Sequence, residues 1–275
     1  MRTAIAIAVV IASAACNKAT PSTNDTSATA SSPSSTSPLP APSAPAASGA
    51  SPSGSRATDT FATSKGDLKV TPLNHATLLF EFAGKSIYLD PTKDADYSGL
   101  PKADYVFLTD IHADHLDPAG LERVKTASTM VVGPKAVADK TAVGTVLANG
   151  EKKPFGAFEV EGVPMYNLTR GPEAGKLFHD KGRGDGFVFT FGDKRVYVSG
   201  DTECTPEMKA LQNIDVAFVC MNLPYTMPPA EAAACIKAFR PKVLFPYHYR
   251  NSNLDELTTA LAGEKGIEVR TRKWY

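Results

Sequence analysis

The feature that most constrains this chain is a run of nine residues, 109–117, which contains two histidines and three aspartates. The run directly follows residues 105–108, a Tyr-Val-Phe-Leu segment typical of a short buried strand. Loops at strand ends present reactive side chains on a rigid scaffold. Imidazole nitrogens and carboxylate oxygens at this density are typical metal ligands. A polar turn capping the next helix would explain Asp117, but it would leave the two histidines unexplained.

Apolar and alternating segments elsewhere predict a mixture of strands and helices. Strands are expected at residues 68–73, 77–82, 86–89, 105–109, 129–132, 160–165, 186–191, 195–199, 214–221, 243–246 and 267–270, and helices at 118–126, 229–239 and 254–262. Hairpins come early and strand–helix alternation comes late in each half. This order favours two mixed β-sheets packed together with helices outside, an α/β (α+β) fold. Asp117 and Thr226 are the expected N-caps of the first two helices.

Residues 1–16 are predicted to form a secretory signal peptide. Arg2 supplies a positive start, residues 4–15 are largely apolar, and small residues precede Cys16. The apolar run is shorter than the about 20 residues that a membrane-spanning helix needs. Cys16 resembles the lipidated cysteine of bacterial lipoproteins, with Ser13 where that pattern usually has leucine. We therefore expect an exported, periplasmic lipoprotein anchored in a membrane through Cys16, with signal cleavage to a soluble periplasmic protein as the alternative.

Residues 17–58 consist almost wholly of serine, threonine, proline, alanine and glycine. They contain no aromatic residue, and Leu39 is their only large aliphatic one. Such a segment cannot bury enough apolar surface to offset the entropy lost on ordering. We expect a disordered tether here, followed by one folded domain at residues 59–275.

Three further cysteines follow Cys16, namely Cys204, Cys220 and Cys235. In an exported protein they can oxidise, but an odd number cannot all pair within the chain. Cys220 and Cys235 lie in apolar segments, which favours small buried hydrophobic residues. No zinc-finger spacing of cysteines occurs.

The motif Asp110-x-His112-x-Asp114-His115 resembles the HxHxDH signature of the metallo-β-lactamase superfamily, with aspartate in place of the first histidine. The resemblance extends over most of residues 66–250 and is nearest to the L-ascorbate-phosphate lactonase-like branch. Further matching segments are Asn74-His75-Ala76-Thr77, residues 87–91, Tyr166-Asn167, Phe178-His179, residues 184–186, residues 198–202 around Asp201, residues 224–227 and residues 244–249 around His248. The resemblance implies an αββα sandwich of two mixed sheets flanked by helices.

The same resemblance implies a centre of two divalent metal ions. Asp110 and His112 would hold metal one. Asp114, His115 and His248 would hold metal two, and Asp201 would bridge the two ions. Zinc is the expected metal, and the oxygen ligand Asp110 also suits manganese or iron.

The third ligand of metal one is left open by the sequence. Asn167 stands where a histidine is usual, and His179 on the following loop is the other candidate. A site with one metal is the alternative to a site with two. We also expect catalytic roles for Asp114, Asp201 and His179, and for His75 in orienting substrate or a ligand. Residues 168–186 contain Lys176, Lys181 and Arg183, which either capture an anionic substrate or form a solvated loop.

These observations predict a metal-dependent hydrolase in which a metal-activated hydroxide attacks a phosphoester or lactone, or an amide. The alternative is a degenerate, non-catalytic lipoprotein of the same fold that binds metal or a ligand. The expected substrate is a small molecule or lipid-derived molecule with negative charge. The formal net charge of zero provides no field to recruit nucleic acid, so no nucleic-acid partner is expected.

Overall fold

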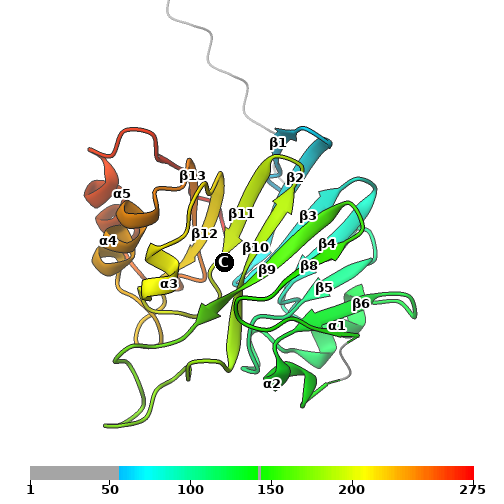
Figure 1. Cartoon of the computed structure of the whole chain (residues 1–275), viewed down its shortest axis with the longest axis horizontal. Helices are drawn as coiled ribbons and strands as arrows, with labels where there is room; N and C mark the ends of the chain where they lie inside the picture. The colour runs from blue at the N-terminus through cyan, green and yellow to red at the C-terminus, as the bar shows by residue number, and fades with distance from the viewer. Residues whose placement is uncertain (1–55, 142–143) are drawn as a thin grey trace, which may run out of the picture. The chain divides into compact units, whose positions relative to one another are not determined.

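The computed structural model describes residues 56–141 and 144–275, which form two seven-stranded β-sheets (Figure 1). The first sheet contains β1 (Asp59–Thr63), β2 (Gly66–Asn74), β3 (Thr77–Phe82), β4 (Lys85–Leu89), β5 (Tyr105–Phe107), β6 (Met130–Gly133) and β7 (Thr145–Val146), in that order. The second contains β8 (Lys152–Phe155), β9 (Phe158–Met165), β10 (Gly184–Phe191), β11 (Lys194–Val198), β12 (Val216–Cys220), β13 (Val243–Tyr247) and β14 (Glu268–Val269), also in chain order. The predicted sandwich of two mixed sheets is confirmed.

Both sheets follow the same plan. Each begins with antiparallel hairpins, β1 to β4 and β8 to β11, and ends with parallel strands, β4 to β7 and β11 to β14. Loops that leave the carboxyl ends of parallel strands gather at one edge of a sheet, where ligands commonly bind. The parallel halves therefore set the position of a site.

Side chains of the first sheet alternate between two apolar cores. Leu78, Phe80 and Phe82 of β3 pack into the large core that they share with the second sheet, whereas Leu79 packs outward. On the outer face Leu79 joins a smaller core with α1 (Pro118–Val124) and α2 (Lys135–Ala138). This period of two follows from the opposite directions of successive side chains in a strand.

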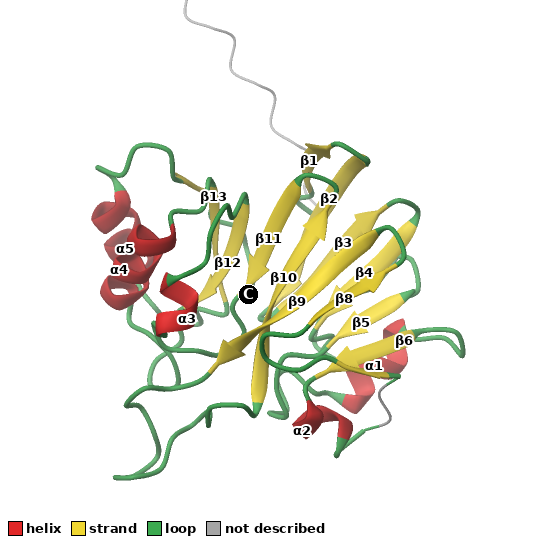
Figure 2. Cartoon of the chain, viewed as in Figure 1, coloured by secondary structure: helices red, strands yellow, loops and turns green. Residues whose placement is uncertain are grey.

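The second sheet is covered on its outer face by α3 (Pro206–Lys209), α4 (Pro229–Phe239) and α5 (Leu254–Leu261) (Figure 2). Helix α4 places Ala232, Ile236 and Phe239 in the large core. The central parallel strands of the second sheet, β12 and β13, are apolar throughout, and all five residues of each are buried. Buried parallel strands covered on both faces are expected to be continuously apolar.

Most predicted elements are present within one or two residues of their expected bounds, and β3 and α4 match at both ends. Five short elements were missed: β1, α2, β7, β8 and α3. The N-cap prediction is correct for Asp117, whose side chain accepts a hydrogen bond from the Ala119 amide. It is wrong for Thr226, because Pro228 caps α4 and the Thr226 hydroxyl accepts a hydrogen bond from the Asn222 amide.

Cys204 and Cys235 form a disulfide, and Cys220 is a buried free thiol. The expectation that Cys235 is simply a small buried hydrophobic residue is therefore wrong, whereas Cys220 is buried as expected. The bond joins the loop after β11 to helix α4. The predicted signal peptide, Cys16 and the tether up to residue 55 lie outside the described residues. Within the described chain no helix has the length and apolarity needed to cross a bilayer.

Candidate metal centre

The predicted site residues come from five separate segments that meet at one place. His75 lies in the β2–β3 turn, Asp110, His112, Asp114 and His115 in the loop after β5, Asn167 and His179 between β9 and β10, Asp201 after β11, and His248 after β13. Three trios of these side chains have ligand atoms within 4.8 Å of one another: Asp110, His112 and His179; His115, Asp201 and His248; and His75, Asp114 and His248. The site therefore joins both halves of the chain.

The backbone at this site is unusual at three residues. His75, Asp90 and His248 each follow the last residue of a strand and have positive φ angles of 52°, 42° and 46°. Such a conformation costs roughly 1–3 kcal/mol at a non-glycine residue and is concentrated at functional sites. Gly200, with φ of 60°, supplies the same kind of turn just before Asp201, and a side chain there would collide with Met165. These turns direct the site side chains away from the strands.

The metal-one group consists of Asp110, His112 and His179. His112 Nδ1 lies 3.0 Å from Asp110 Oδ2, and His179 Nε2 lies 3.9 Å from the same oxygen. Asp110 and His179 are buried, whereas the His112 side chain is 42% exposed. Two imidazole nitrogens and one carboxylate oxygen thus face a common point.

The metal-two group consists of Asp114, His115 and His248. His248 Nε2 lies 3.5 Å from Asp114 Oδ2, and the ring centroids of His115 and His248 are 5.0 Å apart. Asp201 lies between the two groups, since its Oδ2 is 3.4 Å from His115 Nε2 and 3.4 Å from His179 Nε2. This is the position that a bridging carboxylate requires.

The residues fit a bound cation because several buried polar atoms at this point have no hydrogen-bond partner. They are His115 Nε2, His179 Nε2, His248 Nδ1, His248 Nε2 and Asp201 Oδ1. Buried polar groups are nearly always paired, so five unpaired atoms from four neighbouring residues need an explanation. Nitrogen and carboxylate ligands of this kind suit zinc and related divalent ions.

Two of the buried imidazoles, those of His115 and His179, are held from behind by a hydrogen bond. His115 Nδ1 lies 2.8 Å from Asp90 Oδ2, and His179 Nδ1 lies 2.7 Å from Asn167 Oδ1. Such partners fix the ring and its tautomer so that the other nitrogen faces the metal. Asp90 was not assigned a role from the sequence. Its place directly after a strand, like that of His248, was the available signal.

Asn167, one of the two candidates that the sequence left open for the third ligand of metal one, lies behind His179. Its oxygen also accepts a hydrogen bond from the His179 amide at 2.8 Å, and its nitrogen donates to Glu203 Oε1 and to the Tyr225 carbonyl. With both side-chain atoms engaged, Asn167 positions His179, which is the residue that faces Asp110. Glu203 is almost completely buried and fixes this loop further by accepting a hydrogen bond from the Arg170 amide at 2.7 Å.

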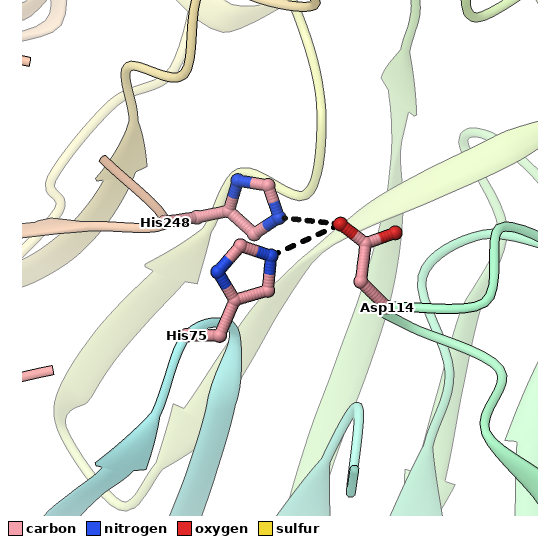
Figure 3. Close-up of side chains that lie close together, drawn as sticks. All are labelled: His75, Asp114 and His248. Carbon is pink, nitrogen blue, oxygen red and sulfur yellow. Dashed lines mark hydrogen bonds and ion pairs between the residues drawn. The ribbon is translucent and has the colours of Figure 1, made fainter. Parts of the chain in front are cut away.

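His75 contacts the metal-two group from the β2–β3 turn, outside the loop after β5 that carries the motif (Figure 3). Its Nε2 lies 3.0 Å from Asp114 Oδ2, and its ring lies tilted at 44° against that of His248 with centroids 3.8 Å apart. Its Nδ1 is hydrogen-bonded to the Tyr275 hydroxyl at 2.9 Å. His75 can therefore orient Asp114, which is one of the two roles expected for His75 from the sequence. Burial lowers the pKa of His75 below the usual value for histidine.

Three cations of residues 168–186, for which the sequence left substrate capture or a solvated loop open, are paired with carboxylates. Arg183 donates two hydrogen bonds to Asp110, Lys181 pairs with Glu207, and Lys176 pairs with Glu173. These pairs do not favour capture of an anionic substrate, one of the two roles that the sequence left open for this loop. The cation at the mouth of the site is Arg250, which the sequence interpretation missed.

The three aspartates of the site keep their negative charge. Burial by itself would raise the pKa of Asp110, Asp114 and Asp201, but the histidines around them, with Arg183 beside Asp110, hold all three values below the usual range. Because Arg183 is paired with Asp110, the three carboxylates would offset about half the charge of two divalent cations.

A cavity of about 370 Å³ opens over the cluster. Its lining residues are His112, Ala113, Asp114, Phe178, His179, Asp201, Tyr225 and Arg250. A second cavity of about 500 Å³ adjoins it and shares Ala113, Asp114 and Arg250. Both metal groups are therefore accessible to a small molecule.

Residues 69–248 match the family model described as the beta-lactamase superfamily domain. A UPF0173 metal-dependent hydrolase of Geobacillus sp. strain WCH70 is 30% identical over 66% of this chain and 85% of its own length. One from Methanopyrus kandleri is 31% identical over 66% of this chain and 84% of its own.

Among solved structures, a protein from Parabacteroides distasonis that carries the name metal-dependent hydrolase is similar, with a TM-score of 0.75 and 38% identity. The match covers 80% of this chain and 100% of that one. Igni18, a metallo hydrolase from Ignicoccus hospitalis, shares the fold with a TM-score of 0.63 at 22% identity, over 75% and 95% of the two chains.

Proposed function

The chain belongs to the beta-lactamase superfamily as a metal-dependent hydrolase, and we propose that it uses two divalent cations, most readily zinc, to hydrolyse a phosphoester or a lactone. The observation that carries this proposal is the convergence of five unpaired, buried ligand atoms around Asp201. Two cations held there would activate water as a nucleophile and stabilise the charge that develops on the substrate.

The protein's own residues divide the remaining work. Asp201 keeps the two groups in a fixed relation, because its Oδ2 is equally distant from His115 and His179. Asp114 is the partly exposed carboxylate of the metal-two group, with 35% of its side chain accessible, and it lines the cavity. It can accept a hydrogen bond from the attacking water and orient it. His75 holds Asp114 in place.

The cavity favours a substrate with one anionic part. Arg250 is half exposed at its edge, and its guanidinium nitrogen lies 3.5 Å from both Asp114 Oδ2 and His75 Nε2. These contacts are long, so the guanidinium retains donors for an incoming oxyanion. An arginine fork matches phosphate and carboxylate geometry.

The opposite wall favours an apolar part. The rings of Phe178 and Tyr225 meet edge to face with centroids 5.0 Å apart. Of the six large hydrophobic residues exposed in the described chain, three lie on these loops: Leu168, Leu223 and Tyr225. Apolar side chains gathered beside a polar site commonly mark a ligand or interaction surface. We therefore propose an amphiphilic, lipid-derived or similar ester as substrate.

An export pathway and a lipid anchor at Cys16 remain part of this proposal. The Cys204–Cys235 disulfide supports export, because structural disulfides are typical of proteins that fold in oxidising compartments. Placement in the bacterial cell envelope would bring the apolar wall close to lipid-derived molecules. Labelling with a fatty-acid analogue in cells, compared between the wild type and Cys16→Ala, tests the anchor. An unlabelled wild type would refute it.

Turnover tests the catalytic proposal. The zinc-loaded protein should hydrolyse aryl phosphodiesters or lactones, and kcat/KM should rise with the alkyl chain length of the lactone. Arg250→Gln should lower kcat/KM for anionic substrates about tenfold while sparing neutral ones, as expected for a lost charge-assisted hydrogen bond. Turnover of neither class by fully loaded protein would favour the alternative of a non-catalytic binding protein.

A further inference from the structure

Arg183 makes an unexpected contact within the metal-one group. Its Nε donates to Asp110 Oδ1 at 3.0 Å and one terminal nitrogen donates to Asp110 Oδ2 at 2.8 Å. The same terminal nitrogen lies 3.4 Å from His112 Nε2. The guanidinium is mostly buried, with 18% of the side chain exposed, and Asp110 is fully buried. This is a bidentate, partly desolvated ion pair, the strongest geometry for arginine and carboxylate.

The contact involves the ligand atom itself. Asp110 Oδ2 is the oxygen nearest His112 Nδ1 and His179 Nε2, so it must face a cation in the metal-one group. The same oxygen accepts the hydrogen bond from Arg183. A guanidinium at this place both occupies a lone pair of the ligand and repels a neighbouring cation.

The pair also explains the departure of residue 110 from the family signature. An aspartate in place of a neutral histidine adds one negative charge, and Arg183 adds one positive charge beside it. Together they have the net charge of the imidazole that they replace. The metal-two group has no comparable partner among the described residues: Arg250 is half exposed and lies 3.5 Å from Asp114.

We propose that Arg183 competes with the cation of the metal-one group for Asp110 and thereby makes that site the weaker, exchangeable one. The proposal presupposes the two-cation centre of the proposed function. Metal two is then the resident ion. Metal one binds only where its concentration is high enough to displace the guanidinium from Asp110 Oδ2.

Metal titration of purified protein tests this inference without reference to turnover. Zinc binding is followed by competition with a chromophoric chelator, and stoichiometry by elemental mass spectrometry. Arg183→Gln should tighten the weaker site about tenfold or more, within the range typical for residues that contact metal ligands. The tighter site should change by a smaller factor, because the Arg183 side chain contacts Asp110 and His112 and makes no hydrogen bond with a described residue of the metal-two group.

Asp110→His supplies the complementary test. With Arg183 retained, the new imidazole leaves the guanidinium unpaired beside the cation, so the weaker site should weaken further. Asp110→His combined with Arg183→Gln restores a neutral ligand without the competing charge, and two tight sites are expected. The two substitutions should therefore be strongly non-additive.

Lys181→Gln is the matched control. Lys181 lies two residues before Arg183 and pairs with Glu207, so the substitution removes one positive charge from the same segment. It should leave the zinc affinities of both sites unchanged. Thermal unfolding of the metal-free variants checks that each one folds. If folded Arg183→Gln bound the weaker, metal-one cation no more tightly than the wild type does, the proposal would be overturned. Arg183 would then be a residue that orients Asp110. Absence of zinc from both sites of the wild type would overturn the proposed function as well.

Discussion

The two groups of the metal centre use the same types of side chain but hold them differently. In the metal-two group His115 and His248 are fully buried, and Asp90 supports His115 with a carboxylate. In the metal-one group His112 is 42% exposed, and His179 is supported by the amide oxygen of Asn167. The two groups also differ in the backbone segments that carry their histidines. His248 directly follows β13, whereas His179 lies in a long segment between β9 and β10.

This difference suggests that ligand count alone does not set affinity. Buried ligands attached to strands lose little freedom when a cation binds, and a carboxylate partner raises the basicity of an imidazole. A loop-borne imidazole with an amide partner lacks both advantages. We therefore expect metal two to bind more tightly than metal one. The following experiments break or sharpen that contrast.

The largest effect is expected from truncation of a metal-two ligand. His248→Ala should abolish tight zinc binding and with it the stabilisation by metal, about 4 kcal/mol when free zinc is at about 1,000 times Kd. His112→Ala is the matched truncation in the metal-one group and should lose much less. Thermal unfolding with and without zinc measures both. Equal losses in the two variants would remove the contrast between the groups.

Reduction of the Cys204–Cys235 bond should have the next largest effect. The bond closes a segment of 31 residues, and a loop of that size is typically worth about 3 kcal/mol of unfolding free energy. It lies next to Glu203, which positions Asn167 and hence His179. Denaturant unfolding of Cys204→Ser should show the loss of stability.

Cys204→Ser should also change the zinc affinities of the two metal groups to different extents. Zinc affinity should fall more at the metal-one group, because Glu203 supports only that side. Cys220→Ala serves as the control, since this thiol is unpaired and lies in β12. If Cys204→Ser weakened both metal sites equally, the bond would act on the fold as a whole.

Exchanging the atoms that support the two imidazoles should have a smaller effect on zinc affinity, with opposite signs in the two groups. Asp90→Asn replaces the carboxylate behind His115 with an amide and should weaken metal two about tenfold. Asn167→Asp does the reverse behind His179 but also removes the donor to the buried Glu203 carboxylate, so it is combined with Glu203→Gln, and the double variant should strengthen metal one by a similar factor, about tenfold. Chelator competition measures both changes. A change of the same sign in both variants would show that packing, and not basicity, controls these imidazoles.

Much of the centre could be predicted from the sequence because its ligands lie in dense, ordered motifs at strand ends. The run from Asp110 to His115 carries its own signal, and strands such as β3 and β13 show clear apolar patterns. The order of early hairpins and later strand–helix alternation also predicted the two mixed sheets. Short edge strands such as β1 and β8 were missed, because their partly exposed residues lack a continuous apolar pattern.

The supporting residues could not be predicted, since they depend on contacts between distant segments. Asp90 meets His115 across 25 positions, and Arg183 meets Asp110 across 73. Asn167 occupies the place in sequence where a ligand was expected, yet its side chain faces the back of His179. Pairing of Cys204 with Cys235 likewise follows from the docking of α4 onto the loop after β11.

The smallest effect concerns a buried carboxyl behind the metal-one group. Asp185 lies two residues after Arg183, and its amide donates a hydrogen bond to the Thr109 carbonyl at 3.0 Å. One of its carboxyl oxygens has no hydrogen-bond partner. Burial raises its pKa to about 7, a shift that the hydrogen bond from Asn149 only partly opposes. The folded protein therefore holds this proton over a range in which the unfolded chain has released it.

Because the folded state binds more protons than the unfolded state between about pH 4 and pH 7, Asp185 should lower stability as the pH rises through that window. The expected slope is at most about 1.4 kcal/mol per pH unit, and it should vanish above the folded pKa. Asp185→Asn keeps the shape and removes the titration. Urea unfolding of the metal-free wild type and variant at about pH 5 and about pH 6 isolates this contribution, because the other titrating groups are common to both proteins. The wild type should lose about 1 kcal/mol relative to the variant over that step. If the two proteins instead kept a constant difference, Asp185 would be ionised throughout, and the back of the metal-one group would contain a further negative charge that favours the cation over Arg183.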